Sequence, residues 1–183
     1  MATKRAHVDK TTTVAAEPAA AWAVLADFGA ISSWVPLIQH SCILSPHADG
    51  PGAVRRVQIA RQTLVERVIE WNPPHRLSYA IDGLPPIVGS ARNTWTLSPG
   101  TDGSTVVTLT TEIDTGRNPV KSLVASKVLE RMSTASELML AGLAAAVAPP
   151  TDPTDEPENE PENEHTGLDQ PAPAHPVQTE ESP

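Results

Sequence analysis

Cysteine is nearly absent from this chain of 183 residues, since Cys42 is the only one. An intrachain disulfide and a cysteine-based metal site are therefore excluded. A lone cysteine in a strand-like segment is typical of a small apolar core residue, so we expect Cys42 to be buried.

Long hydrophobic runs are also missing. The first seven residues lack the apolar stretch of a signal peptide. The longest apolar run, residues 138–148, is interrupted by Gly142 and is too short to cross a bilayer. We therefore expect a cytoplasmic protein without an integral membrane segment.

The motifs of several enzyme classes do not occur. The sequence contains no Gly-x-Ser-x-Gly, no phosphate-binding loop and no dinucleotide fingerprint. None of the six histidines has metal-ligand spacing with another. We expect no metal and no cofactor.

Basic residues are missing from the C-terminal segment, residues 149–183, which holds ten of the 22 acidic residues and nine of the 19 prolines. All 13 Lys and Arg lie in residues 1–148, which are close to neutral, so the net charge of −9 belongs to the tail. We expect one folded domain over residues 1–148 and a disordered acidic tail, whose protein partner the sequence does not identify. A near-neutral domain without a basic stripe argues against binding of nucleic acid.

Within residues 1–148 the pattern predicts strands separated by Gly- and Pro-rich turns. Pro18 suits the first position of a helix over residues 19–27, and a second short helix is expected over residues 30–34. The predicted strands cover residues 8–15, 39–44, 53–60, 63–71, 76–81, 88–97 and 105–113.

A long amphipathic helix is predicted over residues 119–147, with apolar residues at spacings of three and four. The order of elements indicates an α+β fold: a bent antiparallel sheet of about seven strands with the long helix on one side. A helix laid across a bent sheet leaves space between them, and either a filled core or a lined cavity fits this pattern.

Two charged residues stand at alternating positions of neighbouring predicted strands, Arg55 and Glu66. If they face inward they must be paired, hydrated or bound to a ligand, because lone buried charges are very costly. A structural ion pair, or exposure on the outer face, would explain them equally. Their neighbours Arg56 and Arg67 should face solvent. Apolar residues occur on both faces of the strand that carries Glu66, and a slip of one residue would turn this carboxylate outward.

Several segments resemble the START-related superfamily of polyketide cyclase/dehydrase and lipid-transfer proteins, often called SRPBCC, over residues 8–147. The matching segments are Ala20-Ala21-Trp22-Ala23-Val24-Leu25-Ala26-Asp27-Phe28, Trp34, Gly52-Ala53-Val54-Arg55, Glu66-Arg67-Val68 and Leu77-Ser78-Tyr79. This resemblance implies a helix-grip fold around a deep apolar pocket. The plant abscisic acid receptors have a similar pair of strands, which implies that Arg55 and Glu66 line the pocket with Tyr79 as a wall. Their signalling loops have no clear counterpart here.

The remaining candidate ligand-binding residues are apolar or aromatic. Trp34 could close the pocket mouth or pack the short helices onto the sheet, and Tyr79 and Trp95 could be wall or core. On the long helix the best candidates for the wall are Val124, Val128 and Met132.

Three functions remain open. The first is carriage or sensing of a small hydrophobic molecule such as a lipid, polyketide or isoprenoid. The second is an aromatase/cyclase or dehydratase with Glu66, or more weakly Tyr79, as the acid or base. The third is an interaction module whose acidic tail engages a partner, although such tails usually serve solubility.

Overall fold

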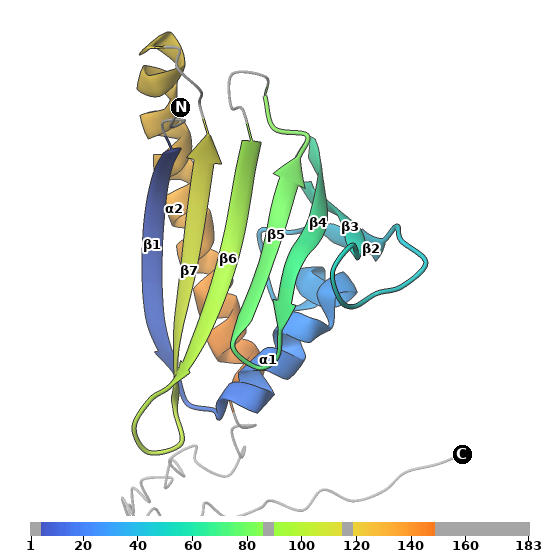
Figure 1. The fold of residues 1–183 in the computed structure, drawn as a ribbon, viewed down its shortest axis with the longest axis vertical. Helices are drawn as coiled ribbons and strands as arrows, with labels where there is room; N and C mark the ends of the chain where they lie inside the picture. The colour runs from blue at the N-terminus through green and yellow to red at the C-terminus, as the bar shows by residue number, and fades with distance from the viewer. Residues whose placement is uncertain (1–4, 86–89, 115–118, 149–183) are drawn as a thin grey trace, which may run out of the picture. The chain divides into compact units, whose positions relative to one another are not determined.

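The computed structural model describes residues 5–85, 90–114 and 119–148. Seven strands, two α-helices and one 3₁₀ helix make up this part of the chain (Figure 1). In chain order they are β1 (Arg5–Val14), α1 (Pro18–Ala26), η1 (Phe28–Ser33), β2 (His40–Ile43), β3 (Val54–Ile59), β4 (Gln62–Asn72), β5 (Arg76–Asp82), β6 (Ser90–Pro99), β7 (Thr105–Asp114) and α2 (Pro119–Val147).

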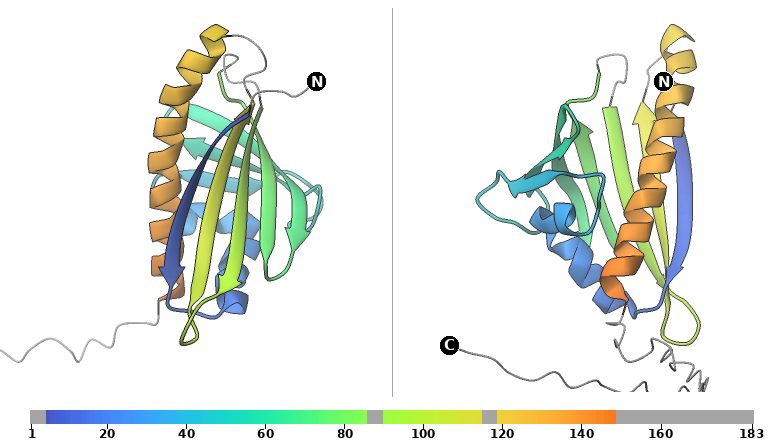
Figure 2. Two further views of the ribbon diagram at one scale, coloured as in Figure 1. Left: turned by 60° about the vertical axis from the view of Figure 1, so that its left-hand side comes forward. Right: turned by 180° about the vertical axis from the view of Figure 1, so that it is seen from behind.

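The seven strands form one antiparallel sheet in the order β1-β7-β6-β5-β4-β3-β2. The sheet curls, and α2 runs along the face that it encloses (Figure 2). Lys10 of β1 holds the helix with an ion pair to Glu137, 2.6 Å between Nζ and Oε1. The predicted α+β fold with about seven strands and a long C-terminal helix is confirmed.

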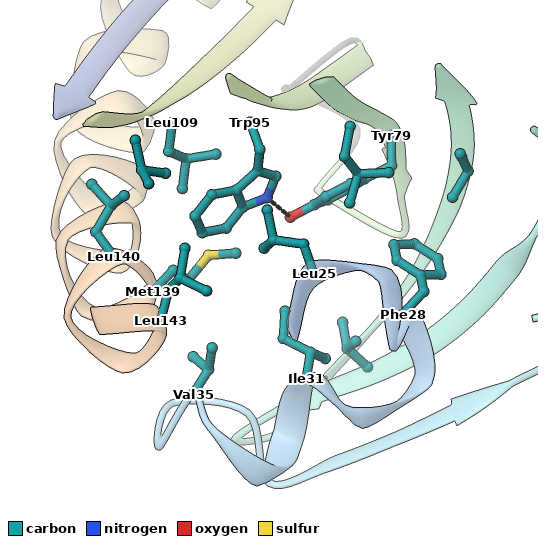
Figure 3. Packing of buried hydrophobic residues seen from close by; sticks show 14 of the residues in the cluster. Leu25, Phe28, Ile31, Val35, Tyr79, Trp95, Leu109, Met139, Leu140 and Leu143 are labelled. Carbon is teal, nitrogen blue, oxygen red and sulfur yellow. Dashed lines mark hydrogen bonds between the residues drawn. The ribbon is translucent and has the colours of Figure 1, made fainter. Parts of the chain in front are cut away.

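The short helices α1 and η1 lie on the same face as α2 (Figure 2). Pro18 occupies the start of α1, where its missing N–H needs no helical partner. The helix buries Trp22 and Leu25, and Trp22 meets Trp71 of β4 edge-on, with 5.2 Å between ring centroids. The core continues between η1, the sheet and the C-terminal half of α2, as Figure 3 shows for Ile31 and Leu143.

Strand β4 contains a bulge where it pairs with β5. Arg55 pairs directly with Glu66, and the pairing of β4 with β5 shifts by one residue between Val68 and Glu70. The alternation is regular up to this point, with Leu64, Glu66 and Val68 buried and Ile69 41% exposed. The extra residue at the bulge changes the alternation after Ile69, so that Trp71 packs against Trp22 while Glu70 pairs with the exposed Arg76. Glu66 therefore faces inward.

The prediction that Cys42 is buried is wrong. Cys42 is exposed, not buried, because it lies on the edge strand β2 opposite Arg56, which is itself exposed. Arg67 also faces solvent, as the alternation along β4 predicts. None of the helices in the described ranges is long and apolar enough to span a membrane. The predicted tail, residues 149–183, lies outside those ranges.

Candidate functional site

A cavity of about 410 Å³ lies between the curled sheet and the middle of α2. Its apolar wall includes Leu64 and Ile81 from the sheet and Val128, Met132 and Met139 from α2. Because the sheet curls away from the middle of the helix, side chains from the two sides do not fill the space between them.

Four polar side chains stand in this apolar wall: Glu66 of β4, Asn93 of β6, Thr111 of β7 and Ser136 of α2. All four are buried, with at most 6% of the residue exposed. The exposed residues Gln62, Pro85 and Arg131 also contact the cavity and mark its opening to solvent. The cavity is therefore mainly apolar, has a few buried polar groups in its wall, and opens to solvent.

Glu66 is held by an ion pair with Arg55, which is itself only 2% exposed. The Arg55 Nε donates a hydrogen bond to Glu66 Oε2 at 2.5 Å, and its Nη1 donates to the backbone oxygen of Phe28 at 2.7 Å. The guanidinium also stacks over the Phe28 ring, 3.9 Å from its centroid, and lies 5.1 Å from that of Tyr79. Both charges are thus compensated within the fold, as burial requires.

A chain of hydrogen bonds links the other polar groups across the sheet to the helix. Tyr79 Oη accepts from Asn93 Nδ2 at 3.2 Å and from Trp95 Nε1 at 3.4 Å, the latter drawn in Figure 3. Thr111 Oγ1 donates to Asn93 Oδ1 at 2.8 Å and lies 3.2 Å from Ser136 Oγ. Ser136 in turn donates to the Met132 carbonyl at 2.8 Å.

Tyr79 is completely buried. Burial, reinforced by the negative charge of Glu66, raises the pKa of its phenol from 10.0 to about 12, although Arg55 and the two donors act in the opposite direction. The phenol therefore stays protonated at neutral pH.

The structure separates the candidate residues from the sequence into three groups. Glu66, Val128 and Met132 contact the cavity. Arg55, Tyr79 and Trp95 are buried but lie outside the cavity lining, where they bond to Glu66 and Asn93 or to each other. The side chain of Val124 lies outside the described residues.

Trp34 belongs to neither the cavity wall nor its mouth. It packs edge-on against Trp95, with 6.3 Å between ring centroids, and it lines a separate open groove of about 650 Å³ with Asp27 and Gly142. Of the two roles considered for Trp34, the geometry fits packing of η1 onto the core.

Sequence reasoning missed Asn93, Thr111 and Ser136. Their signal is a polar residue at a position where the pattern demands an apolar one. Asn93 falls between Ala91 and Trp95 on the inward face of β6, and Ser136 interrupts the apolar stripe of α2. Such an interruption in a buried face indicates either an internal hydrogen bond or a ligand contact.

A curled antiparallel sheet closed by a long C-terminal helix over a cavity defines a helix-grip protein. The profile of the family described as "Polyketide cyclase / dehydrase and lipid transport" matches residues 5–148, and the chain belongs to this family. The superfamily assignment drawn from the sequence is confirmed. No curated protein matches the chain.

Solved structures of similar fold come from several bacteria. The Zhui aromatase/cyclase from Streptomyces sp. R1128 is 26% identical, with a TM-score of 0.59 over 79% of this chain and 92% of that one. An uncharacterized protein from Bacillus thuringiensis is 17% identical, with a TM-score of 0.64 over 78% and 98% of the two chains. The protein XoxI from Bacillus cereus is 18% identical, with a TM-score of 0.65 over 78% and 95%.

Proposed function

We propose that this protein binds a small, mainly hydrophobic molecule in the cavity between the sheet and α2, and carries or senses it. The observation that carries the proposal is the mostly apolar cavity of about 410 Å³ with a single buried carboxylate in its wall. Its volume lies within the range of pockets that hold small molecules, and a few fixed polar groups in an apolar wall are typical of such pockets. The family description, which includes lipid transport, supports the same role.

In this role, buried residues beside the cavity lining hold the polar side chains of the lining in place. Arg55 fixes the Glu66 side chain, and Tyr79 with Trp95 fixes the Asn93 amide. A polar side chain that is already oriented loses less conformational entropy when the ligand binds. These buried partners therefore contribute to affinity without contacting the ligand.

The proposal is tested by filling the cavity. Ala135 lines it, and Ala141 is exposed on the same helix, so Ala135→Phe and Ala141→Phe add the same ring inside and outside. We expect the wild type and Ala141→Phe to bind the fluorescent neutral probe 1-methylpyrene with equal affinity, and Ala135→Phe to lose most of that affinity. Equal binding by all three proteins would place the probe elsewhere and contradict the proposal.

The natural ligand is sought by native mass spectrometry of the purified full chain. A bound lipid-like mass should appear under mild conditions in the wild type and should be missing from Ala135→Phe. Extraction after denaturation then identifies the compound.

An aromatase/cyclase or dehydratase is the second candidate. The family description and the likeness to the Zhui aromatase/cyclase favour it. Among the described residues that line the cavity, Glu66 is the carboxylate that could accept a proton from a bound molecule. Tyr79 is unsuited to this role, because it lies outside the cavity lining and its phenol stays protonated at neutral pH. Glu66→Gln should abolish turnover of a polyketide substrate and retain binding, whereas unchanged turnover would exclude the reaction through Glu66.

A further inference from the structure

The polar groups of the cavity differ in whether they can still donate or accept a hydrogen bond. A hydroxyl has one hydrogen and two lone pairs, and an ionised carboxylate can only accept. Counting the hydrogens already used inside the protein therefore shows which kind of ligand group the cavity can still satisfy.

The two hydroxyl groups in the wall already donate their hydrogens to other protein groups. Thr111 donates to Asn93 Oδ1, and Ser136 donates to the Met132 carbonyl. Both oxygens keep lone pairs that can only accept from a ligand. Among the wall residues that the structure describes, the buried donor that remains is the second N–H of Asn93, since the first is directed at Tyr79 Oη.

Glu66 also favours a hydrogen-bond donor on the ligand, and more strongly than the hydroxyls do. Its Oε2 receives the Arg55 hydrogen bond, and no residue of the described ranges donates to its Oε1. Glu66 is 4% exposed as a residue and contacts the cavity. A carboxylate oxygen that faces the cavity without a protein donor can still accept, so a ligand hydrogen placed there would form a charge-assisted bond.

We infer that the ligand presents a hydrogen-bond donor, a phenolic or alcoholic hydroxyl, to Glu66 of β4; the Thr111–Ser136 pair, on β7 and α2, can accept only from a second donor of the ligand. The inference rests on the proposed function and names the chemical class of its ligand. An ionised carboxylate at the same place would meet the negative charge of Glu66, because Arg55 lies outside the cavity lining with its Nε and Nη1 already engaged.

The test compares three probes that share one fluorescent skeleton: 1-hydroxypyrene, 1-methylpyrene and 1-pyrenecarboxylate, titrated into the full chain at neutral pH. We expect the hydroxyl probe to bind about tenfold or more tightly than the methyl probe, and the carboxylate to bind most weakly. A carboxylate bound as tightly as the hydroxyl probe, or a hydroxyl probe no tighter than the methyl one, overturns the inference. In either case binding of 1-methylpyrene still supports the proposed function; failure of all three probes contradicts the function itself.

Two variants assign the preference to Glu66. In Glu66→Gln the preference for hydroxyl over methyl should shrink, because a neutral amide is a weaker acceptor than a carboxylate. Ala141→Phe, which changes an exposed position of α2 outside the cavity lining, should keep the wild-type preference. An undiminished preference in folded Glu66→Gln would exclude Glu66 as the acceptor. The comparison in the wild type stands by itself if loss of the partner of Arg55 prevents this variant from folding.

Discussion

At the scale of single residues, the site depends on charges that are buried together. Arg55 and Glu66 neutralise each other, and the guanidinium is further covered by the rings of Phe28 and Tyr79. Removing one member of a buried pair leaves an uncompensated charge and typically costs about 3–5 kcal/mol of stability. The pair therefore holds a carboxylate in the cavity wall that the fold could not otherwise keep there.

Tyr79 provides a titration that reports on the same cluster. Its folded pKa is raised from 10.0 to about 12, so folding favours the protonated phenol. The associated stability is fully present below pH 10 and is lost as the pH rises towards 12, by about 3 kcal/mol in total. Because Tyr79 is the only tyrosine, near-ultraviolet absorbance of tyrosinate follows it alone. We expect ionisation near pH 10 in denaturant and well above pH 10 in the folded protein.

The matched variant for this prediction is Tyr79→Phe, which keeps the ring against Arg55 and Phe28. Its loss of stability between pH 10 and pH 12, measured by urea unfolding, should be smaller than that of the wild type. It should also be less stable at neutral pH by about 1–3 kcal/mol, since the Asn93 and Trp95 donors lose their acceptor. Parallel pH profiles for the two proteins would contradict the assignment.

At the scale of elements, the alternation of residues predicted the strands but not how they pair. Strand residues alternate between faces, so Arg56 and Arg67 could be assigned to solvent, while the face of Arg55 and Glu66 stayed open. The bulge after Val68 could not be foreseen, because it depends on how β4 pairs with β5 rather than on β4 alone. Cys42 was placed inside for a related reason: its strand was recognised, but its position at the edge of the sheet was not.

Gly142 shows how closely α2 approaches the segment after η1. A Cβ at this position would overlap the carbonyl oxygen of Trp34. Helix propensity alone would make Gly142→Ala stabilising by about 1 kcal/mol. The clash should reverse this sign, and we expect the variant to lose about 1–3 kcal/mol in urea unfolding, as overpacked cores do.

The control for Gly142→Ala is the opposite exchange at its exposed neighbour. Ala141→Gly should cost about 1 kcal/mol through helix propensity alone. If Gly142→Ala instead gains the amount that Ala141→Gly loses, the helix and Trp34 are not in close contact.

At the scale of the whole molecule, the sequence predicted the fold but left the cavity undecided. Patterns of apolar residues reveal which faces are buried, whereas a cavity depends on how far the sheet curls away from α2. For the same reason Arg55 and Tyr79 were expected in the wall and lie beside it, as cross-strand partners of Glu66 and Asn93 outside the cavity lining. Their buried positions follow from alternation, but which of the inward-facing side chains border the cavity does not.

The charge of the chain is divided unequally, which leads to a prediction about the tail. Residues 149–183 carry ten acidic and no basic residues, and residues 1–148 are nearly neutral. Deleting the tail should leave the thermal unfolding midpoint and the affinity for 1-methylpyrene unchanged. It should lower solubility near neutral pH, because a domain with little net charge has less electrostatic repulsion between its copies. Light scattering at increasing protein concentration measures this effect.

A full-length variant separates charge from length. With the ten acidic residues of the tail replaced by Asn and Gln, solubility should fall as in the truncated chain, since net charge and not chain length provides the repulsion. A shift of the unfolding midpoint on truncation would instead indicate that the tail stabilises the domain. Loss of a captured protein partner on truncation, with solubility unchanged, would support an interaction role for the tail.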